Sequence, residues 1–250
     1  METKVTFIYD YKSIEIPKEL LELQMPDMEG FIDFQFQTLA EKHSTIELPE
    51  GQKHVLTDEM VKKEDLPGLE TVEDYREAIR SEVPMVIVSE QTHMILMNYL
   101  MPQLVQDSTF EINDEEATEE GRKRLLAFQE NAESQGLTLT EAGQREFGIP
   151  GMDEGQVRQY LLYLGRTSFL FKVLAQEYLK RQGQTFDLAS YSSYIKDLAD
   201  ASGMEEPQVR ELVPVHVYME EVPTLVMLDE MSAWIEPQIR FTASENTEAD

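Results

Sequence analysis

Hydrophobic residues recur at helical spacing along most of the chain, and they are densest in its C-terminal third. The spacing predicts helices over Thr167–Leu179, over Leu188–Asp200 and over Val215–Ile235, the last opened by Pro214. Around the last of these helices, apolar residues lie on nearly every side. Such a helix must be covered by other helices or must itself cover something else. The function depends on which of these holds.

The N-terminal part begins with β-type residues. Val5–Tyr9 and Ser13–Ile16 predict two short extended pieces. Met28–His43 fits a helix capped by Asp27, although the alternation from Ile32 to Phe36 also fits a strand. Length favours the helix.

Two capping signals follow. Thr57 predicts the start of a short helix, and Thr71 with Asp74 three residues later forms a capping-box pattern that opens a longer one. The apolar pattern of that longer helix continues past Pro84. We therefore expect a kink at this proline and not the end of the helix.

Asp114–Gln135 has a different pattern, because its apolar residues form only a narrow stripe in a charged helix that Gly136 ends. Such a helix cannot lie in the centre of a core. We expect it to form one half of a protruding hairpin, with the chain returning along Gln156–Leu164. The residues of the stripe are Ala117, Leu125, Phe128 and Ala132.

These patterns predict a mainly α fold, an elongated multi-helix module with protruding helical arms and a small N-terminal β element. We expect one module over residues 1–250. Its segments are an N-terminal strand and helix (1–48), a linker and long helix (49–108), a first arm (109–166), a second arm (167–240) and a disordered tail (241–250).

The charge balance disfavours some classes of partner and favours others. The chain has 49 acidic and 21 basic residues, a formal charge of −28, which disfavours nucleic acid and favours basic partners. The dense basic cluster Arg122–Arg124 follows the acidic run Asp114–Glu120, so intrahelical ion pairs are its expected role. Cysteine is absent, no segment has the length of a membrane span, and Met1–Lys4 lacks the pattern of a signal peptide. We expect a cytoplasmic protein without membrane contacts.

No catalytic signature is present. The sequence has neither a phosphate-binding loop nor a dinucleotide fingerprint, zinc-protease motif or nucleophile elbow. The four histidines are far apart, and the acidic run lacks the spacing of a calcium loop. We expect no metal, no cofactor and no enzymatic activity.

Methionine is frequent, with 13 residues, among them Met94, Met97 and Met101 in one helix and Met219, Met227 and Met231 in another. Methionine side chains adapt their shape to varied partners. Each one taken alone is best explained as core packing. As a set they fit core packing and an adaptable binding surface equally well.

Several stretches resemble the C-terminal chaperone module of bacterial trigger factors. Those stretches are Leu56–Lys63 with Glu70–Arg80, Gln135–Leu139, and the second-arm segment with Gly183, Tyr194–Leu198 and Gly203-Met204. They are similar to the start of that family's long linker helix, to the tip of its first arm and to its second arm. Tyr11–Ile16 and Met28–His43 also resemble the segment before its isomerase domain.

The resemblance covers most of the chain but has departures. The prolyl isomerase domain of the family would lie between His43 and Leu56, where only a turn around Gly51 is found. The basic ribosome-docking domain has no counterpart in this sequence. Isomerase activity and ribosome anchoring are therefore not expected. Prolines also occur inside expected helices, at Pro84, Pro102 and Pro223.

The resemblance implies an ATP-independent, holdase-type chaperone module. Its arms would form an open apolar cradle for unfolded or nascent polypeptides, with basic clients favoured. The alternative is a non-enzymatic assembly or scaffold protein that holds one specific partner or its own copy, as a homodimer. An enzyme is the third hypothesis. The residues expected to line or support the cradle are Met97, Met101, Tyr160, Tyr163, Phe169, Met219, Met227 and Trp234.

Overall fold

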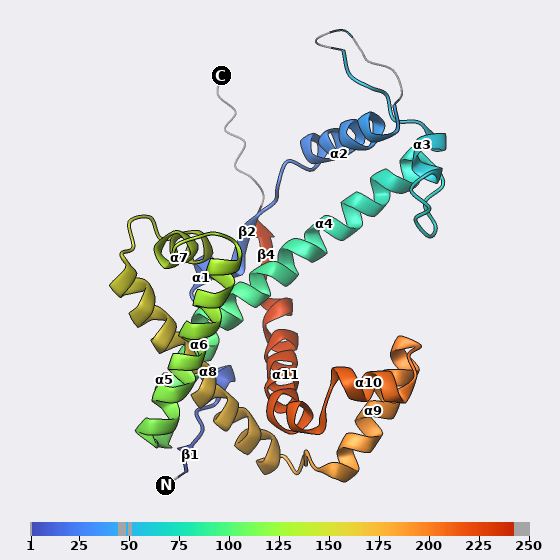
Figure 1. Cartoon of the computed structure of the whole chain (residues 1–250). Helices are drawn as coiled ribbons and strands as arrows, with labels where there is room; N and C mark the ends of the chain where they lie inside the picture. Colours follow the sequence, from blue (N-terminus) through green and yellow to red (C-terminus); the bar gives the residue numbers. More distant parts are fainter. Residues whose placement is uncertain (1, 45–48, 50–51, 243–250) are drawn as a thin grey trace. The chain divides into compact units, whose positions relative to one another are not determined.

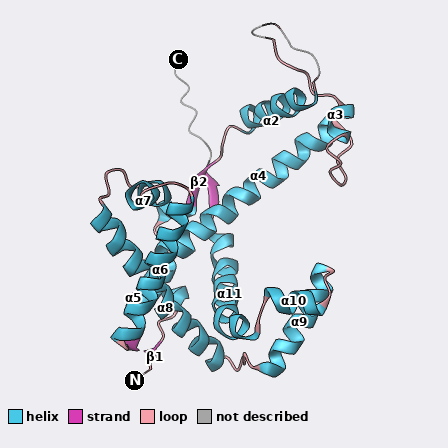
Figure 2. Ribbon diagram, viewed as in Figure 1, coloured by secondary structure: helices cyan, strands magenta, loops and turns pink. Residues whose placement is uncertain are grey.

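The computed structural model describes residues 2–44, 49 and 52–242. The fold is mainly α, as predicted, with a few short strands (Figures 1 and 2). The contacts within the chain divide it into two units. Unit 1 comprises residues 1–15 and 96–233, and unit 2 comprises residues 16–95 and 234–250.

Unit 1 contains the segment predicted as the first arm, 109–166, and residues 167–233 of the segment predicted as the second arm, 167–240. Its elements are β1 (Lys4–Phe7), the 3-10 turn η1 (Tyr11–Ser13), the π-helical turn η2 (Leu96–Leu100), α5 (Met101–Asp107), β3 (Thr109–Glu111), α6 (Asp114–Ser134), α7 (Leu139–Phe147), α8 (Glu154–Arg181), α9 (Leu188–Ser202), α10 (Glu206–Leu212) and α11 (Val215–Ile235), whose last two residues belong to unit 2.

The first arm is the hairpin of α6 and α8, with α7 at its tip, as predicted (Figure 1). Asn113 caps α6 through its side chain, and Thr138 and Asp153 open α7 and α8 with capping boxes. The two long helices approach each other closely where glycines meet. A Cβ atom added to Gly165 would lie 2.8 Å from the Cα atom of Gly121, so neither helix has room for a side chain there.

The predicted boundary between the arms, at residues 166 and 167, lies inside α8. This helix runs without a break from Glu154 to Arg181, because Asp153 caps its start and no proline interrupts it. Gly165 does not end the helix, since close packing on α6 offsets its low helix propensity. The two arms therefore share one helix.

The second arm consists of α9, α10 and the first half of α11 (Figure 1). Asp187 caps α9, and Gly203 ends it in the left-handed conformation with φ +68°. Tyr218 of α11 is buried, and its ring centroid lies 5.4 Å from that of Tyr191 and 5.0 Å from that of Tyr194. The buried cluster of this arm is Tyr191, Ile195, Ala199, Val209, Tyr218 and Val222.

The strand expected at Val5–Tyr9 is found as β1, which pairs antiparallel with β3. The prediction of a second extended piece at Ser13–Ile16 is wrong at its first residue. The side chain of Asp10 accepts a hydrogen bond from the backbone of Lys12 and draws the chain into the turn η1, which includes Ser13.

Unit 2 contains the predicted N-terminal and linker helices. Its elements are α1 (Lys18–Leu21), β2 (Glu22–Gln24), α2 (Met28–His43), α3 (Asp58–Lys62), α4 (Val72–Ile95), the 3-10 turn η3 (Glu236–Gln238) and β4 (Arg240–Thr242).

The helix interpretation of Met28–His43 is confirmed, since Asp27 caps α2 by accepting a hydrogen bond from Gly30. The capping box that opens α4 is also confirmed, because Thr71 and Asp74 exchange backbone-to-side-chain hydrogen bonds. As expected, α4 continues through Pro84. A core cluster of Leu39, Ala40, Leu56 and Val61 joins α2 to the chain around α3.

The prediction of a disordered tail over residues 241–250 is wrong at its start, by two residues. Arg240–Thr242 form β4, which pairs in parallel with β2, so Phe241 and Thr242 are part of a strand. Residues 243–250, and Gly51 at the centre of the predicted turn, lie outside the described residues. Within the described part of the chain, none of the helices combines the length and the apolar composition that a membrane crossing requires.

Candidate functional site

A groove runs along one face of α8 within unit 1. Three neighbouring hollows, of about 340, 290 and 470 Å³, form it. The first and second hollows share Phe169 and Lys172, and the second and third share Val173 and Gln176. We call this row of adjoining hollows the α8 groove. Its α8 residues are Gly165, Ser168, Phe169, Lys172, Val173, Gln176, Glu177 and Lys180.

The spacing of these residues explains why they form one floor. They repeat at intervals of three and four, which places them on a single face of a helix. From Gly165 to Lys180 the helix advances about 22 Å at 1.5 Å per residue. An extended polypeptide rises about 3.3 Å per residue, so the floor matches roughly six or seven residues.

Different elements form the walls. At the first hollow, α6 contributes Lys123 and Arg124, and α11 contributes Glu221 and Thr224. At the third hollow, the wall is the N-terminal segment Glu2–Val5. The groove therefore requires both arms and the N-terminal segment, which are far apart in the sequence.

Ion pairs join the floor of the groove to its α11 wall. The Nζ atom of Lys172 lies 2.7 Å from a carboxylate oxygen of Glu221 and 3.2 Å from one of Glu220. Partial burial acts to lower the pKa of Lys172, but the hydrogen bonds to Glu221 and Glu220 outweigh it, and the pKa lies above its usual value. Lys172 is therefore charged and connects α8 to α11 in the middle of the groove.

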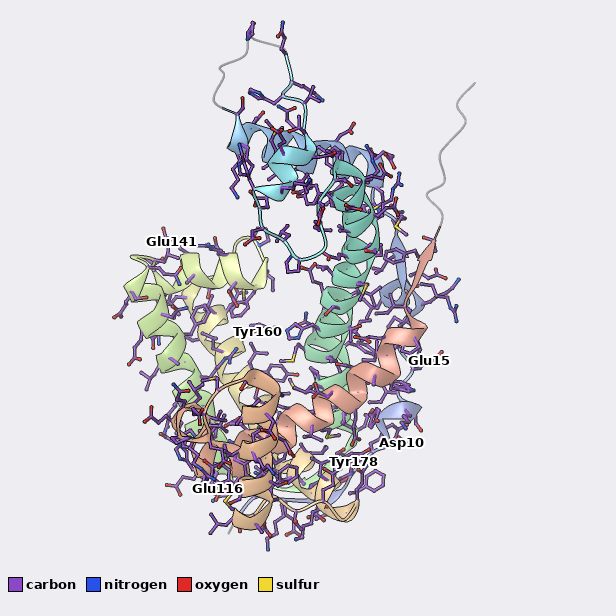
Figure 3. All side chains as sticks on the ribbon, turned by 90° about the vertical axis from the view of Figure 1, so that its right-hand side faces the viewer. Asp10, Glu15, Glu116, Glu141, Tyr160 and Tyr178 are labelled. Carbon is purple, nitrogen blue, oxygen red and sulfur yellow. The ribbon has the colours of Figure 1, made fainter. Side chains whose placement is uncertain are left out.

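Glu116 of α6 holds the N-terminal segment in place (Figure 3). Its Oε2 atom accepts hydrogen bonds from the backbone N–H of Thr3, at 3.0 Å, and from the Thr3 hydroxyl, at 2.8 Å. These bonds lower the pKa of Glu116 below its usual value, because they stabilise the carboxylate form. The charge of this carboxylate therefore fixes the start of the wall at Thr3, while the pairing of β1 with β3 holds Lys4 and Val5.

The hydrogen bonds between Glu116 and Thr3 predict that the attachment of the N-terminal segment to α6 depends on pH. Because the pKa of Glu116 is lowered in the folded protein, the contact is fully present above the ordinary glutamate pKa of about 4.3 and is lost as pH falls through the lowered value. The amide proton resonance of Thr3, followed by NMR, should therefore titrate with a midpoint below about 4.3.

Two variants control this titration. Glu116→Gln should abolish it, and Glu115→Gln, one position earlier on α6, should leave it unchanged. A Thr3 titration that persists in Glu116→Gln would contradict the assignment.

The structure places the sequence-predicted residues in several environments. Phe169 lines the first two hollows of the groove. Met101 and Met227 are buried and can support a surface without lining it, because packed neighbours cover them. Met219 is exposed on α11, with 43% of its surface accessible. Met97 lies half-buried in η2, and Trp234 lies half-buried in unit 2.

Tyr160 and Tyr163 belong to a second feature of the first arm. Their rings stack at 6.4 Å, and Tyr160 also meets Phe147 edge-on at 4.8 Å, which in turn stacks on Phe128 at 5.7 Å (Figure 3 labels Tyr160). This aromatic row starts half-buried at Phe128 and ends at Tyr163, which is 52% exposed. Tyr163 lies about 120° around α8 from Phe169, and neither Tyr160 nor Tyr163 lines any of the three hollows, so the row is not part of the groove.

Sequence reasoning missed most of the residues of the groove. The sequence pattern groups Arg124 with Arg122 and Lys123 as residues that form intrahelical ion pairs, and no pattern distinguishes Val173 or Gln176. The available signal was Gly165, a glycine inside a strong helical pattern, which indicates close approach of another backbone. The partner in that approach, Gly121, lies 44 positions away and cannot be identified from spacing.

Among the described residues, no three His, Cys, Asp or Glu side chains are grouped so as to hold a metal ion. Comparison with protein-family models finds no match, and neither does comparison with curated proteins.

Proposed function

We propose that this chain binds extended polypeptide segments in the α8 groove and acts as an ATP-independent, holdase-type chaperone module. The observation that carries the proposal is the length of the groove, whose floor of about 22 Å accepts six or seven extended residues. The proposal includes a cytoplasmic setting, in keeping with the absence of cysteine.

The composition of the groove favours weak and sequence-tolerant binding. Phe169 and Val173 supply apolar surface, while Ser168, Gln176 and the ion-paired Lys172 supply polar surface. Burial of apolar area contributes about 25 cal/mol per Å², and much of this is offset by the cost of ordering a flexible client. The high negative charge of the chain keeps copies apart and attracts basic clients.

Filling the groove tests the proposal. Ser168 is exposed and lines the first hollow, so Ser168→Trp adds bulk without removing a core residue. We expect this variant to need about tenfold more protein to suppress aggregation of a chemically denatured client, equivalent to about 1.4 kcal/mol of lost affinity. Light scattering during dilution of the denatured client measures the effect.

The matched control is Ser193→Trp, an exposed serine on α9 outside the groove, which should protect the client as well as the unaltered protein does. If the unaltered protein gives no protection at stoichiometric excess, or if both variants protect equally well, the α8 groove is not a client site.

The second candidate function is assembly of one specific partner or of a second copy. It is favoured by apolar side chains that are exposed outside the groove, such as Met85 on α4, 70% exposed, and Phe34 on α2, 64% exposed. Recovery of one stoichiometric partner in a pull-down, or a tight dimer in analytical ultracentrifugation, would support this function over the chaperone.

A further inference from the structure

Arg124 differs from the two basic residues before it on α6. Arg122 and Lys123 each form an ion pair with a glutamate three positions earlier, with N–O distances of 3.7 and 2.6 Å. Arg124 forms no ion pair with any residue that the structure describes, although it lines the first hollow of the α8 groove. Its side chain starts directly above α8, because its Cβ atom would lie 2.9 Å from a Cβ atom added to Gly165.

The carboxylates that line the same hollow already have partners. Glu120 pairs with Lys123 at 2.6 Å, and Glu221 pairs with Lys172 at 2.7 Å. Glu220, which lies in the neighbouring hollow, also pairs with Lys172. The guanidinium of Arg124 is therefore the cation in this lining that has no anionic partner among the described residues.

A hydroxyl in the opposite wall also lacks a partner. The Oγ1 atom of Thr224 on α11 is buried and forms no hydrogen bond to any described residue, and Thr224 lines the same hollow as Arg124. A buried hydroxyl without a partner is destabilising, and a ligand oxygen nearby would relieve this cost. Arg124 and Thr224 thus both belong to the lining of one hollow, and each has a donor group without a partner among the described residues.

We propose that this end of the α8 groove binds a carboxylate of the client, with Arg124 as the charged partner and Thr224 as a second donor. The inference rests on the proposed function of the groove and assigns a chemical preference to one end of it. The apolar group that carries the carboxylate would lie against Phe169, which lines the hollow beside Ser168. The planar guanidinium matches a carboxylate with two parallel hydrogen bonds.

The lining favours a single negative charge over a phosphate. Glu120 and Glu221 lie in the same hollow, so a doubly charged group would be repelled by both more strongly than a carboxylate would. A carboxylate can come from the C-terminus of a client or from an aspartate or glutamate side chain. The overall negative charge disfavours acidic clients in general, so an acidic group should be accepted at this end only.

The test compares peptides that differ only in the carboxylate. Eight-residue fluorescent peptides with an apolar centre are prepared with a C-terminal acid or a C-terminal amide, and a second pair, both amidated, carries an internal Asp or Asn. Fluorescence anisotropy measures their affinity. We expect the acid form of at least one pair to bind about three- to fivefold more tightly than its neutral form, the range for a partly exposed ion pair. The pair that discriminates identifies the source of the carboxylate.

Two variants locate the effect. Arg124→Gln should abolish the preference for the acid form, whereas Arg122→Gln, which removes the same charge two positions earlier on α6, should keep it. Equal binding of acid and neutral forms to the unaltered protein would overturn the carboxylate site and leave the groove as a peptide site. Equal loss of preference in both variants would also overturn it, because the effect would then come from net charge. Absence of binding by all four peptides would overturn both proposals.

Discussion

Replacing Tyr218 with alanine should lower the free energy of unfolding of the second arm by about 3–5 kcal/mol, the range for removal of a buried aromatic ring. The ring is 3% exposed and is packed against three other rings, of Phe186, Tyr191 and Tyr194, at 5.0 to 5.7 Å. Its loss leaves a cavity between α9 and α11. Urea denaturation followed by circular dichroism at 222 nm measures the change, and hydrogen exchange at the amide of Ile195 localises it to this arm.

The control for this prediction is Tyr218→Phe, which keeps the ring and should change the stability by less than about 1 kcal/mol. Leu188→Ala at the start of α9 is a second control, because Leu188 is 69% exposed and is not part of the cluster. If Tyr218→Ala is as stable as Tyr218→Phe, the ring does not hold the second arm together.

Replacing Gly165 with leucine should destabilise the first arm by about 1–3 kcal/mol, the usual cost of overpacking. A Cβ atom at this position would lie 2.8 Å from Gly121 Cα and 2.9 Å from the carbonyl oxygen of Glu120, and these backbone atoms cannot move aside as a side chain can. Leucine has the higher helix propensity, so intrinsic preference alone would stabilise α8 by roughly 1 kcal/mol. The sign of the measured change in urea denaturation therefore separates packing from propensity.

Gly155→Ala is the matched control, a glycine in the first turn of the same helix. Its added Cβ atom would meet only the flexible carboxylate of Asp153, at 3.2 Å. We expect no change, or a stabilisation below about 1 kcal/mol. A Gly165→Leu protein as stable as this control would mean that α6 and α8 can move apart without cost.

The close approach of α6 and α8 at Gly165 should also affect peptide binding, because it fixes the position of Arg124 over the groove. If Gly165→Leu separates α6 from α8, peptide affinity and the preference for the acid form should fall together. In Arg124→Gln only the preference should fall. The two variants thus distinguish the shape of the groove from its charge.

The helix positions could be predicted from the sequence because their signals are local. Asp27, Thr71 and Gly136 cap or end helices through atoms within a few residues of themselves, and these predictions are confirmed. The strands were harder to predict. β3 and β4 are short, and each is stabilised by a partner far away in the sequence, so the first was missed and the second was placed in a disordered tail.

The candidate site was predicted only in part, for a related reason. Burial of Met101 and Met227 depends on which elements cover them, and a helical pattern that is apolar on every side does not identify its neighbours. Phe169 lines the α8 groove, whereas Tyr160 and Tyr163 lie on another side of the same helix. In place of the one continuous aromatic and methionine-rich cradle that we expected, unit 1 has two separate features, the α8 groove and the aromatic row of the first arm.

By itself the sequence determined a mainly helical fold, the start and end of most helices, the acidic charge and the absence of cysteine chemistry, because each depends on composition or on contacts within a turn or two. Only the tertiary structure decided where the groove lies. Two sets of contacts bring the floor, the walls and the unpaired Arg124 together. They are the close approach of α6 and α8 at Gly121 and Gly165, and the ion pairs from α8 to α11. Such contacts join residues tens of positions apart, and no local pattern specifies them.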